Sequence, residues 1–442
     1  MILGGAFGFW GYPYVVKKRL EAKLTFQPHE FGILFARLRP VTRSQEEQTK
    51  GESFLSTAAF DLEEYINNKN DINVKMIETE IIPFFEHAQD VESFAKHYGA
   101  NLVIWGEIDG GTEQILLHIQ SVKSDKTRYA LSQVFHKGDI ADIKVAAEFF
   151  RAGDMKRLLS FILGYTNYMR LEDPKELKKN ALKYFEKAKG FRDQLNNAYV
   201  HFYMGNVYYF TDQFDLAEKQ YKELLIEDRE KIKSEFQDFG LQMEVFNNLG
   251  LLALKQNQLE EALKYFRTAK DEGKCLYGGE ALSPGCVSLL YNFCNVFLEK
   301  EEYAVAAEYG EKAIKLFDQF KDDFLKSFLL QIRNDTALAY IERKDQQNST
   351  RLQHAKSHLA EVARILEQDV SNLLELKLNA AHGALHRNWG RIYLKEDDWE
   401  HALKSFEQSR IFDPDNPKVY LLLAQLYDER CQQEDNIRIA EN

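Results

Sequence analysis

Apolar and polar positions between residues 246 and 269 follow a helical period on both sides of a short polar turn, KQNQ. Apolar or small residues recur three, four and seven positions apart, the spacing that places side chains on one face of a helix. The pattern predicts two helices packed against each other, with Gly250 and Ala262 at their close contact. The positions that share a face are Phe246, Leu249, Gly250 and Ala253 in the first helix, and Ala262, Phe266 and Ala269 in the second.

The same pattern recurs along residues 139–432, so this stretch is one unit of an array. All seven positions agree with the tetratricopeptide repeat (TPR), and the spacing resembles the longer repeats of kinesin light chains and related bacterial TPR regulators. The resemblance implies an α-solenoid whose concave groove is lined by the first helices, with a closing helix expected at 417–430. The small residues of the six aligned repeats are Gly164, Gly205, Gly250, Cys294, Ala337 and Gly390.

Two repeats depart from this pattern. In the fourth repeat Cys294 takes the place of glycine, and Gly310 follows on the second helix. The fifth repeat has Ala337 at the small position and an extended polar turn, RKDQQNSTR, at 343–351. We expect the fifth repeat to be the weakest member of the array, because a long polar turn couples its two helices poorly.

A different pattern precedes the array, between residues 30 and 137. The expected order is β-α-β-α-β-β-β, an α/β sandwich. The run FAKHYGANLVIWGEID is similar to the TolB amino-terminal-like domains, which occur in bacteria between a membrane segment and a TPR array. The resemblance implies such a module over 25–138 and attaches no catalytic residue to it. The expected strands are 30–38, 72–78, 101–108, 113–123 and 127–136, and the expected helices are 52–69 and 90–100.

The predicted fold class is therefore α+β, a small amino-terminal α/β sandwich followed by an all-α TPR solenoid. Residues 2–16 carry no charge, and Lys17, Lys18 and Arg19 follow them. A basic flank after an apolar run indicates a short membrane anchor in residues 1–24, with the rest of the chain on the cytoplasmic side. The TolB-like resemblance favours the periplasm instead, and a buried or disordered leader is the alternative to an anchor. Residues 433–442 are expected to form a disordered tail.

Composition excludes some functions. A net charge of −12 and a pI near 5.5 argue against a general nucleic-acid binder, which needs a basic face. The four cysteines form no CxxC pair. Cys275 and Cys286 are close enough in sequence to form a bridge, but free thiols in a reducing compartment are the favoured interpretation at this cysteine density.

Catalytic chemistry is not indicated. The sequence contains no nucleophile elbow, phosphate loop or kinase signature, so we expect a protein that is not an enzyme and needs no cofactor. The pairs His354/His358 and His382/His386 have the i, i+4 spacing that can hold a metal ion, but neither forms an HExxH motif. Structural histidines are the favoured interpretation for both pairs.

Asparagines recur on the first helices of the repeats. With the small residue counted as position eight, they occupy positions five, six and nine, which a spacing of three and four residues places on one side. A side-chain amide both donates and accepts, so a row of amides can hold an extended peptide backbone, as in the resembling TPRs of O-linked GlcNAc transferase. Alternatively, these amides bond to neighbouring backbone or face water. The candidate peptide-binding residues are Tyr199, Phe202, Asn206, Tyr209, Asn247, Asn248, Tyr291, Asn292, Asn295, Asn334 and Asn388.

The sequence thus predicts a non-enzymatic scaffold whose groove binds an extended segment of a partner protein, in bacterial signalling or regulation near a membrane. The lysines of the chaperone-type carboxylate clamp are missing, since its position-five lysine is here Phe202, Asn247 and Tyr291. A sensor, in which the α/β module binds a small ligand and the array relays it, is the second hypothesis. A third is an enzyme whose catalytic domain lies outside this chain.

Overall fold

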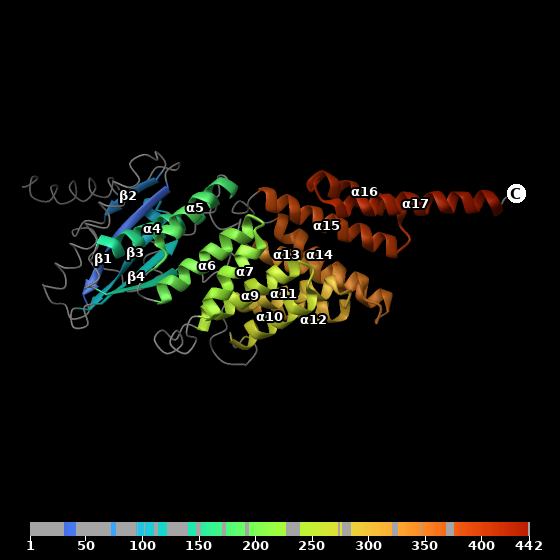
Figure 1. Ribbon diagram of the computed structural model, residues 1–442. Coiled ribbons are helices and arrows are strands. Elements are labelled where there is room, and N and C mark those ends of the chain that lie inside the picture. Colours follow the sequence, from blue (N-terminus) through green and yellow to red (C-terminus); the bar gives the residue numbers. More distant parts are fainter. Residues whose placement is uncertain are drawn as a thin grey trace, which may run out of the picture. The chain divides into compact units, whose positions relative to one another are not determined.

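The chain forms two compact units in the computed structural model. Unit 1 contains the β-sheet and helices α4 to α7, and unit 2 contains the chain from Gln242 onward (Figure 1). The residues that the structure describes are 31–40, 72–76, 94, 96–100, 102–109, 114–121, 140–146, 152–169, 174–190, 194–226, 239–272, 275, 284–320, 326–345, 347–367 and 375–440.

The sheet of unit 1 is built around two apolar strands. It has the order β2-β1-β3-β4-β5, with β1 parallel to both neighbours and β4 antiparallel to both of its own. Ile33, Leu34, Val103 and Ile104 are fully buried, as the near-continuous apolar runs of central parallel strands require. The strands are β1 (Phe31–Pro40), β2 (Ile72–Met76), β3 (Leu102–Asp109), β4 (Gln114–Ser121) and β5 (Ile140–Ala146).

Strands β1 to β4 lie where the alternation of apolar residues predicts strands, but the last strand differs. The segment paired with β4 is Ile140–Ala146, which the sequence assigned to the array, and not 127–136. Both segments have similar apolar spacing, so periodicity alone cannot decide which of them pairs. The sheet therefore continues past the expected boundary at residue 138, and unit 1 also includes the first two helix pairs.

Gly99 ends a helical turn just before β3 with a φ of 71°, the conformation expected of a glycine that closes a helix. Three other predictions, the helix at 52–69, the strand at 127–136 and the anchor in residues 1–24, lie outside the described residues. Among the helices that the structure describes, none is long and apolar enough to span a bilayer.

Helices α4 to α16 form six antiparallel pairs within the described residues, and α17 follows them (Figure 1). Unit 1 holds α4 (Ala152–Met169), α5 (Pro174–Ala188), α6 (Gln194–Phe210) and α7 (Phe214–Ile226). The remaining helices are α9 (Phe239–Lys255), α10 (Leu259–Glu272), α11 (Pro284–Glu299), α12 (Tyr303–Phe320), α13 (Lys326–Glu342), α14 (Asn348–Glu367), α15 (Glu375–Lys395), α16 (Trp399–Phe412) and α17 (Pro417–Ala440).

Four of the pairs share one turn between their helices. A non-glycine residue adopts a left-handed conformation there, with φ of 58° or 59°, at Asp212, Asn257, Glu301 and Asp397. The next N–H then bonds back to a carbonyl of the first helix, as from Gln258 to Ala253 at 2.8 Å. This αL turn satisfies the free carbonyls at the helix end and fixes the same hairpin each time.

A glycine and an aromatic ring define the contact inside most pairs. A Cβ on Gly250 would lie 2.4 Å from a ring atom of Phe266, which is fully buried. The same contact brings a ring atom to 2.6 Å or less from the virtual Cβ in the pairs Gly164/Phe185, Gly205/Tyr221 and Gly390/Phe406. The small residue is required because the ring of the second helix occupies the volume that its side chain would fill.

The fourth pair inverts this arrangement. Cys294 is buried on α11, and its thiol lies against the backbone of Gly310 on α12. The aromatic ring of this pair comes from Tyr309, which stacks on Phe293 at 4.8 Å between centroids. Thr336 of α13 fills the space beside Gly310, and its Oγ1 lies next to the position that a Cβ on Gly310 would take. The glycine of this pair is therefore on the second helix, and the larger Cys294 is on the first.

The turn of the fifth pair is shorter than the sequence indicated, because α14 begins at Asn348. Arg351 lies in that helix, is buried, and donates to the Ile341 carbonyl and to Asn348 Oδ1. Arg343 and Asp345 form an ion pair within the turn. The last helix also extends further than expected: α17 runs to Ala440, through most of the segment predicted to be a disordered tail.

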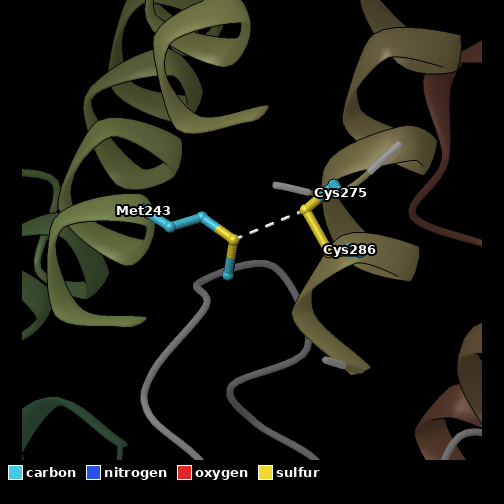
Figure 2. Close-up of a disulfide and its surroundings, with 3 residues drawn as sticks. All are labelled: Met243, Cys275 and Cys286. Atoms are coloured by element: carbon cyan, nitrogen blue, oxygen red, sulfur yellow. Dashed lines mark hydrogen bonds between the residues drawn. A yellow bond between two sulfur atoms is a disulfide. The ribbon is translucent and has the colours of Figure 1, made fainter. Parts of the chain in front are cut away.

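A disulfide joins Cys275, which follows α10, to Cys286 on α11 (Figure 2). Both sulfurs are buried, and the Cys275 sulfur lies 3.6 Å from the Met243 sulfur, the contact dashed in Figure 2. The oxidised cysteine carries no proton, so this is a packing contact between two sulfurs. The expectation of free thiols is wrong for this pair, because the two Cα atoms lie 5.4 Å apart, within the range that a disulfide spans.

Candidate functional site

The asparagines of unit 2 lie between successive first helices. Asn292 of α11 donates to Asn247 Oδ1 of α9 at 2.7 Å, and Asn247 donates to Asn248 Oδ1 at 3.4 Å. Asn388 of α15 donates to the carbonyl of Asn334 on α13 at 2.8 Å. All five side chains are at most 7 % exposed. The amides of Asn292 and Asn388 therefore hold one first helix to the next, and contact of these asparagines with a bound peptide stays a prediction.

The candidate residues of unit 1 are also buried. Asn206 accepts a 2.6 Å hydrogen bond from Tyr221 of the second helix in its own pair. Phe202 packs edge-on against Tyr203, and Tyr209 packs against Phe210 and Phe214. Together with Tyr199, these aromatic side chains are part of the core of unit 1. A role for them in binding an apolar side chain remains untested.

Tyr291, Asn295 and Asp335 form a polar cluster on α11 and α13, in which Tyr291 is buried and the other two are more exposed. The Tyr291 hydroxyl donates to Asp335 Oδ2 at 2.6 Å, and both Asn295 and Asp335 are only half-buried. Desolvation raises the pKa of Asp335, while the Tyr291 hydrogen bond and the positive charges of Lys418 and Arg387 oppose that rise. The carboxylate therefore lies near cations of two later helices and keeps part of its surface accessible.

A basic row runs along α15, the next first helix after α13. It consists of Arg387, Arg391 and Lys395, at i, i+4 and i+8. Arg387 donates to Asp413 Oδ2 at 3.0 Å, and Glu342 of α13 lies 2.8 Å from Arg391 and 3.5 Å from Lys395. These pairs are partly exposed, so the row combines fixed geometry with access to solvent.

We name the set Asn295, Asp335, Arg387, Arg391 and Lys395 the first-helix row. Asn295 was a candidate from the sequence, and the other four were not. The search for the lysines of a carboxylate clamp compared position five in the second, third and fourth repeats only. Arg387 was missed because it occupies position five of the sixth repeat. Basic residues at i, i+4 and i+8 were the sequence signal from which Arg387, Arg391 and Lys395 could have been identified.

Each histidine pair stacks on the ring of one aromatic residue in a neighbouring helix. His354 and His358 stack on Tyr340 of α13, with centroids 4.9 and 5.7 Å away. His358 Nε2 also lies 3.0 Å from Glu311 of α12, which accepts a 3.1 Å hydrogen bond from the Tyr340 hydroxyl. The hydrogen bond to His358 is the main cause that lowers the pKa of Glu311. This pair therefore links three helices.

His382 and His386 stack on Phe412 of α16 in the same way, at 4.6 and 5.5 Å. Burial lowers the pKa of both rings. The i, i+4 spacing thus places two imidazoles along one ring. Among the described residues, no group of three His, Cys, Asp or Glu side chains could hold a metal ion.

Known proteins match the helical part of the chain. Residues 204–274 match the family model described as tetratricopeptide repeat. This segment is a tetratricopeptide repeat. Because the glycine–ring contact of the matched segment recurs in pairs before and after it, the carboxy-terminal helical region is a TPR solenoid. No curated protein matches the sequence.

Solved structures resemble the chain at low identity. A chain of the Cut9–Hcn1 hetero-tetramer of the APC/C is 14% identical, with a TM-score of 0.44, over 62% of this chain and 43% of that one. PilF of Pseudomonas aeruginosa is 17% identical, with a TM-score of 0.41, over 63% and 100%. Aspartyl phosphate phosphatase F of Bacillus subtilis is 16% identical, with a TM-score of 0.42, over 63% and 72%. We infer nothing further from likenesses at these scores.

Proposed function

We propose that this TPR protein is a non-enzymatic scaffold whose first-helix row binds an extended segment of a partner protein. The observation that carries the proposal is the set of partly exposed polar and charged side chains on α11, α13 and α15. Asn295 offers an amide donor and acceptor, Asp335 a carboxylate, and α15 three cations. Each of these groups can pair with the backbone or with a charged side chain of a peptide.

The buried asparagines support the row indirectly. By bonding α11 to α9 and α15 to α13, the amides of Asn292 and Asn388 fix the spacing of the helices that carry the row. A preformed row loses less conformational entropy on binding than a flexible one. In this proposal the asparagine ladder positions the binding residues, and Asn295 is the member that contacts the peptide.

The test is a set of charge-neutralising variants of the full chain. A partner segment is first selected from a random peptide library and its affinity is measured by fluorescence anisotropy. We expect Arg391→Ala and Lys395→Ala each to weaken binding by about fivefold, since an ion pair at a rim contributes about 1 kcal/mol. Lys404→Ala on the exposed side of α16 is the matched control and should bind as the wild type does.

A second pair of variants separates positioning from contact. Asn248→Ala with Asn292→Ala removes an inter-helix hydrogen bond, so it should lower stability by about 1 kcal/mol per lost bond as well as affinity. Asn295→Ala should lower affinity and leave the urea midpoint unchanged. Equal affinity of the wild type, Arg391→Ala and Asn295→Ala would refute the proposal.

We further propose that the scaffold works in signalling or regulation at a membrane, on the oxidising side. The support is the apolar run of residues 2–16 and the Cys275–Cys286 disulfide, since disulfides persist in oxidising compartments and are rare in the cytosol. The disulfide thus favours the periplasmic alternative over the cytoplasmic one.

A further inference from the structure

The turn between α16 and α17 lies directly on α15. A Cβ on Gly383 would be 2.5 Å from the Cβ of Asp413, so the two backbones approach closely. Asp413 Oδ2 accepts hydrogen bonds from Arg387 at 3.0 Å and from Asn416 at 2.7 Å. Asp413 therefore joins α15 to the end of α16 and to the start of α17. We call residues 409–416 the α16–α17 corner.

Two histidines of α15 complete this contact. His382 and His386 both stack on Phe412, the residue before Asp413, at 4.6 and 5.5 Å between centroids. Each histidine directly precedes a residue of α15 that contacts Asp413. In the part of the chain that the structure describes, neither imidazole has a hydrogen bond or an ion pair. The stack on Phe412 is therefore what holds both rings against the corner.

This environment favours the neutral form of both imidazoles. Burial lowers the pKa of both rings, and the charge of His382 lowers that of His386 further. Arg387, the next residue, is a further positive charge. The other charged groups that the described residues bring near α15 are not bonded to either ring. They are Asp413 of α16, Asp335 and Glu342 of α13, Lys356 of α14 and Lys418 of α17.

We propose that His382 and His386 form a pH-sensitive clamp, which holds the α16–α17 corner closed at neutral pH and releases it in acid. In acid each imidazole binds a proton, and two adjacent positive charges are better solvated in water than against Phe412. The stack then opens, and the corner moves away from α15.

The clamp regulates the first-helix row, and this part of the inference rests on the proposed function. Arg387 belongs to the row, and its partner Asp413 belongs to the corner. When the corner opens, Arg387 loses the ion pair that fixes its side chain. A row that is no longer preformed loses more conformational entropy on binding, so acid should weaken peptide binding.

The pH range follows from the direction of the pKa change. An imidazole in water titrates near 6.5, and both rings titrate lower in the closed corner. The open form therefore binds more protons than the closed form as the pH falls through about 6.5, and the closed form is favoured above it. Because two histidines act together, the opening constant rises by up to about a hundredfold per pH unit in this range.

The clamp is tested by hydrogen exchange of the full-length protein at pH 7.5 and 5.0, corrected for the intrinsic exchange rates. The amides of Asp413, Asn416 and Val419 report on the corner, because each donates to a carbonyl three or four residues earlier. We expect their protection to fall at least about fivefold in acid, while α9 and α10 stay protected.

Two variants identify the cause. His382→Phe with His386→Phe keeps two rings for the stack but cannot bind protons, so the protection of the corner should be equal at both pH values. His401→Gln, an exposed histidine of α16, is the matched control and should keep the wild-type pH dependence. Equal protection of the wild-type corner at both pH values, or an equal fall in the double variant, would overturn the clamp. A fall of the same size in α9 and α10 would show global unfolding and would also overturn it.

Peptide binding separates the clamp from the proposed function. The probe is the library-selected peptide, in a version without Asp, Glu or His. Its affinity should fall between pH 7.5 and 5.0 by a factor at least about three times larger for the wild type than for the double phenylalanine variant. Equal losses for the two proteins would overturn the regulation of the row. A peptide affinity that Arg391→Ala leaves unchanged refutes the proposed function, whereas exchange at the corner that does not depend on pH refutes the clamp.

Discussion

Replacing Gly250 by alanine should destabilise the array even though alanine is the better helix former. Three ring atoms of Phe266 lie between 2.4 and 2.9 Å from the position of the new Cβ. Phe266 is fully buried on α10, so its ring cannot swing into solvent to make room. The added methyl group therefore pushes α9 away from α10 or forces the ring from its rotamer.

The expected magnitude is the difference between two terms. Overpacking a dense core costs about 1–3 kcal/mol, and three ring atoms closer than 3.0 Å put this substitution in the upper part of that range, at about 2–3 kcal/mol. Alanine in place of a glycine inside a helix stabilises that helix by about 1 kcal/mol. The net loss is about 1–2 kcal/mol, and it should disappear when Phe266→Leu supplies the missing space in the same chain. The double-mutant cycle should therefore give a coupling energy of about 1–2 kcal/mol.

Urea unfolding of the full chain, followed by circular dichroism at 222 nm, measures the four corners of this cycle. Hydrogen exchange locates the change, because repeat arrays open segment by segment. Faster exchange should be confined to α9, α10 and their neighbours. A stability equal to or above that of the wild type for Gly250→Ala, or additive effects in the double variant, would refute the contact as described.

Three more predictions follow from other features. Cys275→Ser with Cys286→Ser should lower the unfolding free energy by about 3 kcal/mol, since the bridge closes a loop, and a reducing agent should destabilise the wild type but not this variant. Alkylation of Cys275 or Cys286 in unreduced, unfolded protein, located by peptide mapping, would contradict the bridge. His382 and His386 bind protons more readily when unfolded, so stability should fall as pH drops below about 6.5, and His382→Gln with His386→Gln should flatten that part of the profile; an unchanged profile would exclude the pair as its cause. Deleting residues 1–24 should move the protein from the membrane to the soluble fraction, and a full chain that is soluble without detergent would show that these residues are no anchor.

The helix pairs could be read from the sequence because their contact uses adjacent, local signals. A glycine, an alanine at the turn of the second helix and a ring four residues later specify a close antiparallel pair wherever they occur together. The exchange of Cys294 and Gly310 was visible as a departure from that pattern. The structural reason for this departure was not visible, because Thr336, which fills the space beside Gly310, lies on the next helix, α13.

The candidate site was harder to predict, for a geometric reason. Positions five, six and nine lie on one side of a helix, but that side is shared between the groove and the neighbouring first helix. Asn292 bonds to the neighbouring first helix, Asn248 is fully buried, and Asn295 is half-buried. Sequence spacing gives the angle around a helix and not the direction in which the next helix lies. The disulfide depended in the same way on how close in space the two cysteines lie, which their sequence separation does not give.

The exchanged pair Cys294/Gly310 has a consequence for folding fidelity. Neighbouring repeats of similar sequence can mispair, with the first helix of one docking on the second helix of another. Here α11 on α10 would press the Cys294 thiol into the ring of Phe266, and α9 on α12 would set Gly250 against Gly310 with no ring to fill the contact between them. Both wrong pairings pack poorly and are therefore less stable than the correct one. The fourth pair thus favours the correct pairing of first and second helices when unit 2 folds.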